Sequence, residues 1–281
     1  MTASSSAQTP GKKDALAGRE DAYNGFLIDL EGLPSSPEAL LASLRASEAV
    51  WRERAYRGIW LRLPKRLAGS TGAAVEAGFE FHHAEKEYLM LTRWMVEGQP
   101  DALPPNASHQ VGIGACVVNE HGKILAVREL YGPLRGTGVW KLPTGLVHVG
   151  EDITETAERE VLEETGVRAR FAGVLGVRQA HNVAFGKSDM FFLVALTPEP
   201  GQTELRPQLE ELEGACWMDP AELTEQPHFV KRPLFQSMLR ACRDWAEGRP
   251  AALHQRKITS DDEQRRDLIL LRSTGGEDGE L

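Results

Sequence analysis

The chain has 281 residues, and this length predicts two domains rather than one. Its composition, 41% hydrophobic and 26% charged, is typical of a soluble globular protein. The formal net charge of -9 argues against a general nucleic-acid binder and against a protein that docks on anionic membranes, because both need a basic surface. No run is long enough for a membrane-spanning helix, so no membrane partner is expected.

The three cysteines, Cys116, Cys216 and Cys242, lie far apart in the sequence and form no CxxC pair. A disulfide scaffold or a zinc site is therefore not indicated, and a reducing compartment, the cytoplasm, is expected. The Ser-rich start of the chain has no apolar signal core, although organellar targeting stays open at this point.

Residues 23–96 predict a small α/β domain behind a flexible tail at residues 1–22. Ser36 is a candidate N-cap, and Pro37 follows at the first helical position. The expected elements are a strand at 26–32, a helix at 36–51, a strand at 58–64, a helix near 69–78 and a strand or hairpin over 79–95. The segment 97–107, rich in Pro, Asn and small residues, is the predicted linker.

Residues 108–248 predict a second α/β domain, and the charged tail 249–281 is expected to be partly disordered. The strand 109–118 is expected to pair with 123–130 as a hairpin around an NEHG turn. The remaining expected elements are a helix at 151–165, strands near 167–177, 189–197 and 214–218, and a helix near 231–245.

The predicted helix at 151–165 is unusually acidic. From Glu151 to Glu164 it holds seven carboxylates and a single basic residue, Arg159. Residues three and four apart are neighbours on a helix, so Glu160, Glu163 and Glu164 share one face and repel one another. Such a cluster suits a hard divalent cation such as Mg²⁺, which binds carboxylate oxygens and bridges to substrate phosphates. A solvated acidic face is the alternative, but such faces usually alternate in sign.

The spacing of particular residues in this stretch forms a longer motif. It runs from Gly145 over five residues to Glu151, over seven to Arg159-Glu160-Val161, over one to Glu163-Glu164, and over one to Gly166-Val167. This pattern resembles the Nudix box of the Nudix hydrolases at every fixed position, and it stands in the loop–helix–glycine context that the motif requires. The resemblance implies a Nudix α/β/α sandwich with a mixed sheet.

The resemblance also implies a chemistry. Members of the family hydrolyse a nucleoside diphosphate linked to another group, with Mg²⁺ or Mn²⁺, so a small-molecule nucleotide is the expected partner. The implied metal ligands are Glu160, Glu163, Glu164 and the carbonyl oxygen of Gly145. Glu163 also resembles a catalytic base, Arg159 the residue that orients the carboxylates, and Glu151 the partner of that arginine.

Stretches outside the box, among them GIWLRLP, RGTGVWKLPTGLVHVGEDI and FGKSDMFF, are similar to a Nudix subgroup with an extra N-terminal "pre-Nudix" domain. That subgroup includes plant-type ADP-ribose and NADH pyrophosphatases and the protein encoded antisense to basic fibroblast growth factor. The similarity covers about residues 23–220. It implies an acetyltransferase-like α/β fold for 23–96, and ADP-ribose or NADH as the substrate with AMP as a product.

Three alternatives to this function stay open at this stage. They are a catalytically weak scaffold that binds nucleotides or regulates, an mRNA-decapping enzyme and a coenzyme A pyrophosphatase. A homodimer contact also stays open.

Some weaker signals carry further expectations. Glu211, between Glu210 and Glu213, is a candidate for an additional metal ligand, with a solvated loop as the alternative. His82 and His83 are not expected to bind a metal, because adjacent side chains on a strand point to opposite faces.

The G-x-G pairs at 112–114 and 136–138 are no dinucleotide fingerprint, because no helix follows them. Trp140, Tyr131 and Phe185 are candidates for stacking on a base, with a packing role as the alternative.

Overall fold

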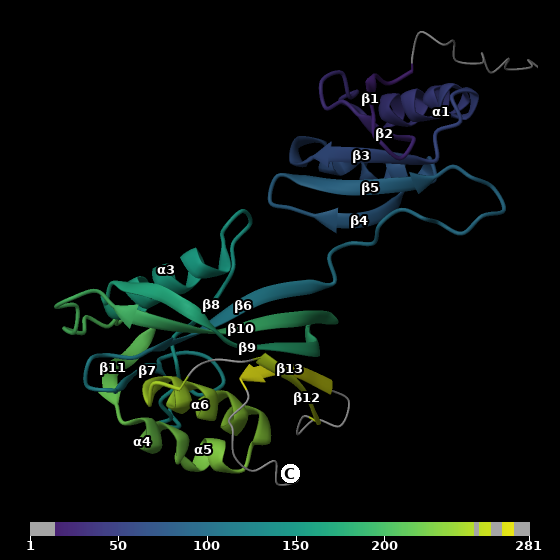
Figure 1. Cartoon of the computed structure of the whole chain (residues 1–281). Helices are drawn as coiled ribbons and strands as arrows, with labels where there is room; N and C mark the ends of the chain where they lie inside the picture. Colours follow the sequence, from purple (N-terminus) through teal and green to yellow (C-terminus); the bar gives the residue numbers. More distant parts are fainter. Residues whose placement is uncertain (1–14, 250–252, 260–265, 273–281) are drawn as a thin grey trace, which may run out of the picture. The chain divides into compact units, whose positions relative to one another are not determined.

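The computed structural model describes residues 15–249 and the backbone of 253–259 and 266–272. The chain divides into two compact units, residues 1–106 and 107–281 (Figure 1). The flexibility expected for residues 1–14, and for the rest of the C-terminal tail, lies outside the described residues. Each unit has a sheet and a hydrophobic core of its own.

The N-terminal unit is a five-stranded sheet with the strand order β1-β2-β3-β5-β4. The strands β2 and β3 run parallel, and the helix α1 makes the crossover between them. In chain order the elements are β1 (Gly18–Glu20), β2 (Gly25–Ile28), α1 (Pro37–Glu53), β3 (Gly58–Pro64), the 3₁₀ helix η2 (Lys65–Ser70), α2 (Thr71–Glu76), β4 (Glu80–Ala84) and β5 (Tyr88–Trp94).

The helix α1 begins where the sequence predicts. The Ser36 hydroxyl accepts a hydrogen bond from the Ala39 backbone N–H at 3.2 Å, and Pro37 occupies the first helical position. The apolar face of α1 then packs on alternate residues of β3, which gives this unit a core made of Leu40, Leu44 and Trp51 with Ile59, Leu61 and Leu63.

Two features of this unit differ from the expectations. The strand β1 lies inside the segment 1–22 that the sequence assigns to a flexible tail, and it pairs antiparallel with β2. His82 and His83 do not point apart, because the register of β4 shifts between Phe81 and His83. Their Nδ1 atoms are 2.6 Å apart, and the Nε2 of His82 contacts the Pro104 carbonyl oxygen.

The C-terminal unit is built on a six-stranded mixed sheet with the order β12-β13-β9-β10-β6-β8, in which β10 runs parallel to β6. A second ladder joins β11 to β7. The elements are β6 (His109–Val117), β7 (Ile124–Glu129), β8 (Thr144–Leu146), α3 (Ile153–Thr165), β9 (Ala169–Ala184), β10 (Lys187–Pro198), β11 (Leu212–Met218), α4 (Pro220–Thr224), α5 (Pro227–Val230), α6 (Pro233–Ala246), β12 (Leu253–Thr259) and β13 (Arg266–Arg272).

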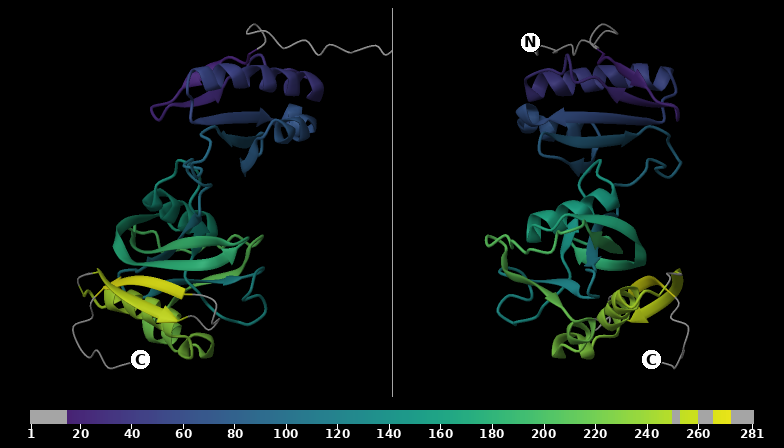
Figure 2. Two further views of the ribbon diagram at one scale, coloured as in Figure 1. Left: turned by 90° about the vertical axis from the view of Figure 1, so that its right-hand side faces the viewer. Right: turned by 60° about the vertical axis from the view of Figure 1, so that its left-hand side comes forward.

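Helices cover both faces of the six-stranded sheet, as Figures 1 and 2 show. On one face, Ala157 and Val161 of α3 pack on Ile113 of β6. On the other, Leu239 and Cys242 of α6 join a separate core. The predicted α/β/α sandwich is therefore confirmed, and the acidic helix is one of its outer layers.

The expected hairpin of 109–118 with 123–130 is wrong. β7 turns away from β6 and pairs antiparallel with β11, while a single bridge, Val118–Ile124, joins it to β6. The chain after β7 returns through a second bridge, Val127–Lys141. That return places β8 and its Thr144 and Gly145 beside α3. The β12–β13 hairpin, which pairs with β9, lies in the tail where the sequence predicts no element.

Candidate active site

The acidic helix α3 is held at both ends by local interactions. The Glu155 carboxylate accepts a hydrogen bond from the Asp152 backbone N–H at 3.0 Å, and Asp152 is the N-cap. Gly166 ends the helix with a φ of 75°, a conformation that glycine adopts without strain. Glu151 therefore precedes the helix. The sequence had predicted that it lies in the first turn.

Arg159 lies at the centre of the carboxylate cluster and donates hydrogen bonds to three glutamates. Its Nε and Nη2 donate to the two carboxylate oxygens of Glu151 at 2.6 and 3.0 Å. Its Nη1 donates to Glu160 at 2.7 Å and to Glu163 at 3.1 Å. The two-pronged contact with Arg159 lowers the pKa of Glu151 to about 2 and raises the pKa of the guanidinium further above its usual range.

Glu160 lies against the backbone of β8. A Cβ atom added to Gly145 would overlap the carboxyl group of Glu160, so this position has room for glycine alone. Burial raises the pKa of Glu160, and its hydrogen bond with Arg159 opposes that rise. The backbone of Gly145 and the side chain of Glu160 are therefore packed together, although they are fifteen positions apart.

Glu164 is the most buried acid of the cluster, with 8% of its surface exposed. Burial raises its pKa to about 8, and the nearby carboxylates of Glu160 and Glu211 add to the rise. Lys141 and the backbone N–H of Thr144 act in the opposite direction. Its Oε2 atom is buried and has no hydrogen-bond partner among the described residues. A buried carboxylate oxygen without a partner is costly and marks a site that can accept a positively charged ligand.

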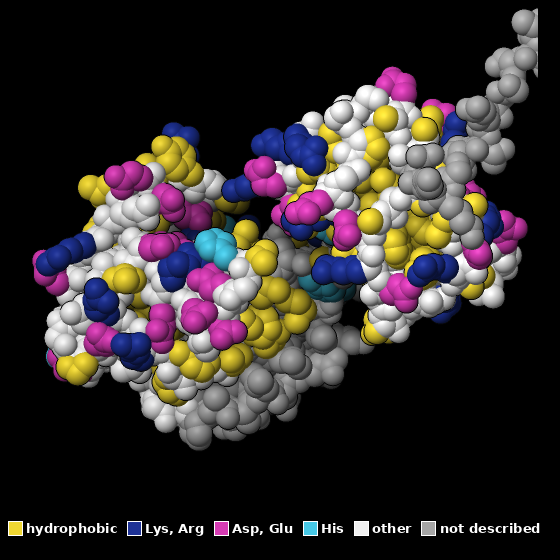
Figure 3. Space-filling view, turned by 90° about the horizontal axis from the view of Figure 1, so that it is seen from above, with side chains coloured by type: hydrophobic (Ala, Val, Ile, Leu, Met, Phe, Trp, Pro, Cys, Tyr) yellow, Lys and Arg dark blue, Asp and Glu magenta, His cyan; other side chains and the backbone are white. Residues whose placement is uncertain are grey.

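These side chains surround an open, polar hollow of about 620 Å³. Its lining residues are His148, Arg159, Glu160, Glu163, Glu164, Gln208 and Glu211. The hollow brings together the four sequence-predicted residues of α3 with Glu211, while Glu151 lies behind Arg159 and Gly145 lies behind Glu160. Figure 3 shows acidic side chains with basic ones among them on the face of this unit that is seen from above. Gln208 and His148 are lining residues that sequence reasoning missed.

As the side chains stand, no three His, Cys, Asp or Glu residues within 15–249 converge on one point. The reason lies in Arg159, because its guanidinium holds the carboxylates of both Glu160 and Glu163. Glu163 is the freer of the two, since 55% of its side chain is exposed.

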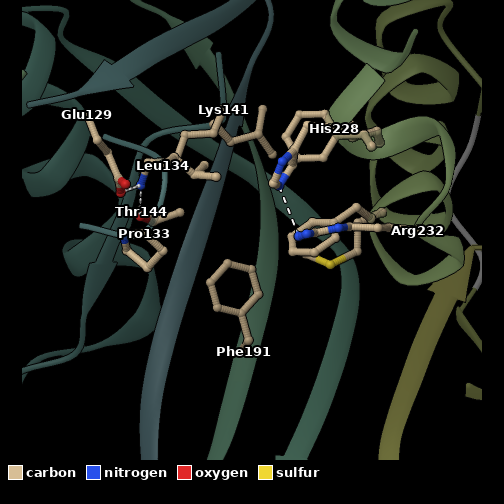
Figure 4. A pocket seen from close by; sticks show the side chains of 13 residues that line it. Glu129, Pro133, Leu134, Lys141, Thr144, Phe191, His228 and Arg232 are labelled. Carbon is tan, nitrogen blue, oxygen red and sulfur yellow. Dashed lines mark hydrogen bonds and ion pairs between the residues drawn. The ribbon is translucent and has the colours of Figure 1, made fainter. Parts of the chain in front are cut away.

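A second cavity, of about 300 Å³, lies between the sheet and the helices α5 and α6 (Figure 4). We call it the apolar pocket; its lining residues are Glu129, Pro133, Leu134, Lys141, Leu142, Thr144, Phe191, His228, Phe229, Arg232, Phe235, Met238 and Leu239. Sequence reasoning did not find it. The three proposed stacking residues do not line it: Tyr131 and Phe185 are exposed, and Trp140 lies beside the Arg128 guanidinium.

The α/β/α fold and the loop–helix carboxylate site define the Nudix hydrolase class, and comparison with known proteins agrees. A Nudix hydrolase domain model matches residues 16–95, and a NUDIX domain model matches residues 108–238. Nudix hydrolase 2 of Arabidopsis thaliana is 40% identical over 268 residues, which are 94% of this chain and 95% of that protein. The chain belongs to the Nudix hydrolase family, whose members generally use divalent metal ions and act on small nucleotides.

Other proteins are similar over smaller parts of this chain. Nudix hydrolase 7 of Arabidopsis thaliana is 44% identical over 234 residues, covering 83% of this chain and 82% of that protein. Nucleoside diphosphate-linked moiety X motif 6 of Homo sapiens is 38% identical over 189 residues, covering 65% of this chain and 59% of that protein. The solution structure of the E. coli ORF135 protein aligns with 52% of this chain and 96% of its own, at 22% identity and a TM-score of 0.41. Among the described helices, none is both long and apolar enough to cross a membrane.

Proposed function

We propose that this chain hydrolyses the diphosphate linkage of nucleoside diphosphate derivatives, foremost ADP-ribose and NADH, and releases AMP. The observation that carries the proposal is the buried Glu164, which lines the same hollow as Glu160, Glu163 and Glu211 and whose Oε2 has no hydrogen-bond partner among the described residues. Four acids around one open hollow, with Arg159 organising two of them, form a site for a cation and a phosphate rather than a solvated helix face.

The donor set fits a Mg²⁺ or Mn²⁺ ion, because hard divalent cations prefer carboxylate oxygens. Glu160, Glu163 and Glu164 would hold the metal, with Glu211 and the carbonyl of Gly145 as further ligands. The close approach of Gly145 to Glu160 supports a shared role for the two. When bound, the metal supplies charge neutralisation at the phosphate oxygens and lowers the pKa of water.

The residues of the chain have distinct proposed tasks around that metal. Arg159 fixes the rotamers of Glu160 and Glu163, and Glu151 in turn fixes Arg159 through two hydrogen bonds. Glu163 is the exposed member of the cluster and has one hydrogen bond, so it is the carboxylate best placed to accept a proton from an attacking water.

The substrate assignment has separate support. The similarity extends over both units of the chain, and it includes a relative named for nucleoside diphosphate-linked substrates.

The three cysteines are free thiols, which supports the proposed cytoplasmic location.

The test is a turnover panel with the full chain, with Mg²⁺ and with Mn²⁺. The substrates are ADP-ribose, NADH, NAD⁺, coenzyme A, nucleoside triphosphates and capped RNA. We expect the highest kcat/KM with ADP-ribose or NADH, and chromatography should show AMP as a product. Free nicotinamide or free ribose instead of AMP would contradict the proposal, because it would place cleavage at a glycosidic bond. Turnover of capped RNA or coenzyme A alone would support one of the alternatives.

A further inference from the structure

The hollow beside α3 is lined by more hydrogen-bond acceptors than donors. Four of its seven lining residues are glutamates, and a carboxylate that holds a metal only accepts hydrogen bonds. The other three are His148, Arg159 and Gln208. A phosphate is an acceptor as well, so each phosphoryl oxygen that the metal does not hold needs an N–H donor from the chain. These three side chains are the possible donors among the lining residues.

The N–H groups of Arg159 are already in use. A guanidinium has five of them. The Nε donates to Glu151 at 2.6 Å, and the Nη1 donates to Glu160 at 2.7 Å and to Glu163 at 3.1 Å. The Nη2 donates to Glu151 at 3.0 Å and to the Leu146 carbonyl oxygen at 3.3 Å. A phosphate could therefore bind Arg159 only by displacing one of these acceptors, which leaves His148 and Gln208 as the available donors.

His148 lies at the Arg159 end of the row of acids. Its backbone N–H donates to the Oε2 of Glu151 at 3.1 Å, and its Nδ1 lies 3.6 Å from the same oxygen. Because Glu151 also holds Arg159, its carboxylate fixes the loop between β8 and α3 beside the guanidinium. The His148 side chain lines the hollow and is 70% exposed, and an imidazole carries at least one N–H in either charge state. It can therefore donate to an anion in the hollow.

Gln208 lies at the other end of the acids, beside the last turn of α3. Its backbone N–H donates to the Glu164 carbonyl oxygen at 3.0 Å, and the N–H of Arg206 donates to the Thr165 carbonyl oxygen at 2.7 Å. These two bonds fix the loop between β10 and β11 on the end of the helix. The Gln208 side chain is half-buried and lines the hollow, and within residues 15–249 its amide has no hydrogen-bond partner. Both N–H groups of that amide are free to donate to a ligand.

We propose that His148 and Gln208 bind the diphosphate of the substrate from the two ends of the row of acids, by donating to phosphoryl oxygens that the metal leaves free. This inference rests on the proposed function, which puts a metal-bound diphosphate in the hollow. The helix rises about 7.5 Å from Arg159 to Glu164. Donors at the two ends of this row can each reach one phosphoryl group of a diphosphate, whereas a monophosphate engages one donor at a time.

The test uses two probes, methylenediphosphonate, a diphosphate analogue that resists hydrolysis, and inorganic phosphate. Calorimetry with the full chain and Mg²⁺ gives the Kd of each. The wild type should bind the diphosphonate at least tenfold more tightly than phosphate, and in EDTA neither should bind, because the carboxylates repel anions. Loss of a hydrogen bond to a charged group weakens binding by about tenfold or more. His148→Leu and Gln208→Leu should each weaken the diphosphonate by that factor and phosphate by less than about threefold.

Matched variants control for the loss of a polar side chain. His121→Leu removes an imidazole that is 73% exposed in the turn between β6 and β7. Gln202→Leu removes an amide from the same loop as Gln208, where it lines a different hollow. Both should bind the diphosphonate like the wild type. His148→Gln, which restores an N–H donor, should recover part of the affinity that His148→Leu loses.

A Mn²⁺ titration without either probe separates phosphate binding from metal binding. His148→Leu and Gln208→Leu should keep the Mn²⁺ affinity of the wild type, whereas Glu164→Gln should lose it. A thermal scan checks that each variant is folded. If Gln208→Leu does not fold, Gln208→Asn takes its place, because it keeps the amide but withdraws it by one carbon, and it should weaken the diphosphonate in the same way.

The inference is overturned if the wild type does not prefer the diphosphonate, if the variants bind it like their controls, or if they lose Mn²⁺ affinity. The last result would make His148 or Gln208 a metal ligand instead. None of these measurements needs turnover. A chain that gives the expected binding but hydrolyses no diphosphate would refute the proposed function and leave the two donors assigned. Unchanged diphosphonate binding in variants of a chain that releases AMP would do the reverse.

Discussion

Gly145 of β8 and Glu160 of α3 pack so closely that any side chain at position 145 would overlap the glutamate carboxyl group. The same carboxylate accepts a hydrogen bond from Arg159 at 2.7 Å. A strand backbone on one side and an arginine on the other therefore fix its position. This double constraint makes the site sensitive to changes that leave every acid in place.

The first prediction concerns Gly145→Ala. The new methyl group must displace Glu160, and a misplacement of about 1 Å can cost on the order of 100-fold in rate. We expect kcat with ADP-ribose to fall by about that factor while the circular dichroism spectrum stays unchanged. Gly173→Ala is the control, because an added Cβ there meets no atom within 4 Å and its φ is not positive. Equal activity of the two variants would show that the contact between Gly145 and Glu160 does not contribute to catalysis.

The second prediction concerns Arg159→Lys. Lysine keeps the charge but cannot form the fork that contacts Glu151 twice and also reaches Glu160 and Glu163. Replacing a residue that orients metal ligands typically lowers metal affinity or activity by about 10–100-fold. We expect a fall of that size in kcat and a higher Mg²⁺ concentration at half-maximal rate. Arg170→Lys, an exposed arginine paired with Glu199, should behave like the wild type. A normal Mg²⁺ dependence in Arg159→Lys would contradict the orienting role.

The third prediction concerns turnover in Glu164→Gln. The change keeps the size of the side chain and removes one charge from the proposed metal site. We expect AMP release to fall by roughly 10²–10³-fold or more, because charge stabilisation is a dominant catalytic contribution. Glu158→Gln is matched on the same helix, where Glu158 accepts from the Phe171 N–H and pairs with Arg170 outside the hollow. If both variants keep wild-type turnover, Glu164 is not part of the site.

The fourth prediction concerns the pH dependence of stability in the same variant, measured in EDTA. Folding raises the pKa of Glu164 from 4.5 to about 8, so the folded protein holds this proton more tightly than the unfolded chain. Stability should therefore fall as pH rises from about 4.5 to 8, by up to about 1.4 kcal/mol per unit. Glutamine lacks this proton, so Glu164→Gln should have the higher Tm at pH 8, by at least about 2 °C.

That Tm difference should shrink at pH 5, where Glu164 is protonated in the folded state. Adding Mg²⁺ at pH 8 should raise the Tm of the wild type more than that of Glu164→Gln. Parallel curves of Tm against pH for the two proteins would show that Glu164 ionises normally.

The fifth prediction concerns the separate units. Residues 107–281 have their own sheet and cores, so this fragment should fold and hydrolyse ADP-ribose without the N-terminal unit. A shorter fragment, 108–248, lacks β13, which pairs with β9, and β12, which pairs with β13. We expect it to fold with a lower Tm, because β9 loses a neighbouring strand. Circular dichroism and a thermal scan of both fragments test this, and an unfolded 107–281 would place the domain boundary elsewhere.

The sequence by itself determined the acidic helix, its cap at Gly166 and the face shared by Glu160, Glu163 and Glu164. These features depend on residues three to four positions apart, and helical geometry brings such residues together in any protein. It also determined that two α/β units follow each other, because the spacing of apolar residues predicts most strands and helices without knowledge of their partners.

Tertiary structure alone decided which strands pair and what the site contains beyond the helix. β7 pairs with β11 rather than with β6, and this follows from long-range burial that local periodicity does not encode. The close packing of Gly145 against Glu160 and the buried, unpartnered oxygen of Glu164 require β8 to lie beside α3. The apolar pocket draws on residues between Glu129 and Leu239, and its shape exists only where packing of sheet and helices leaves a gap.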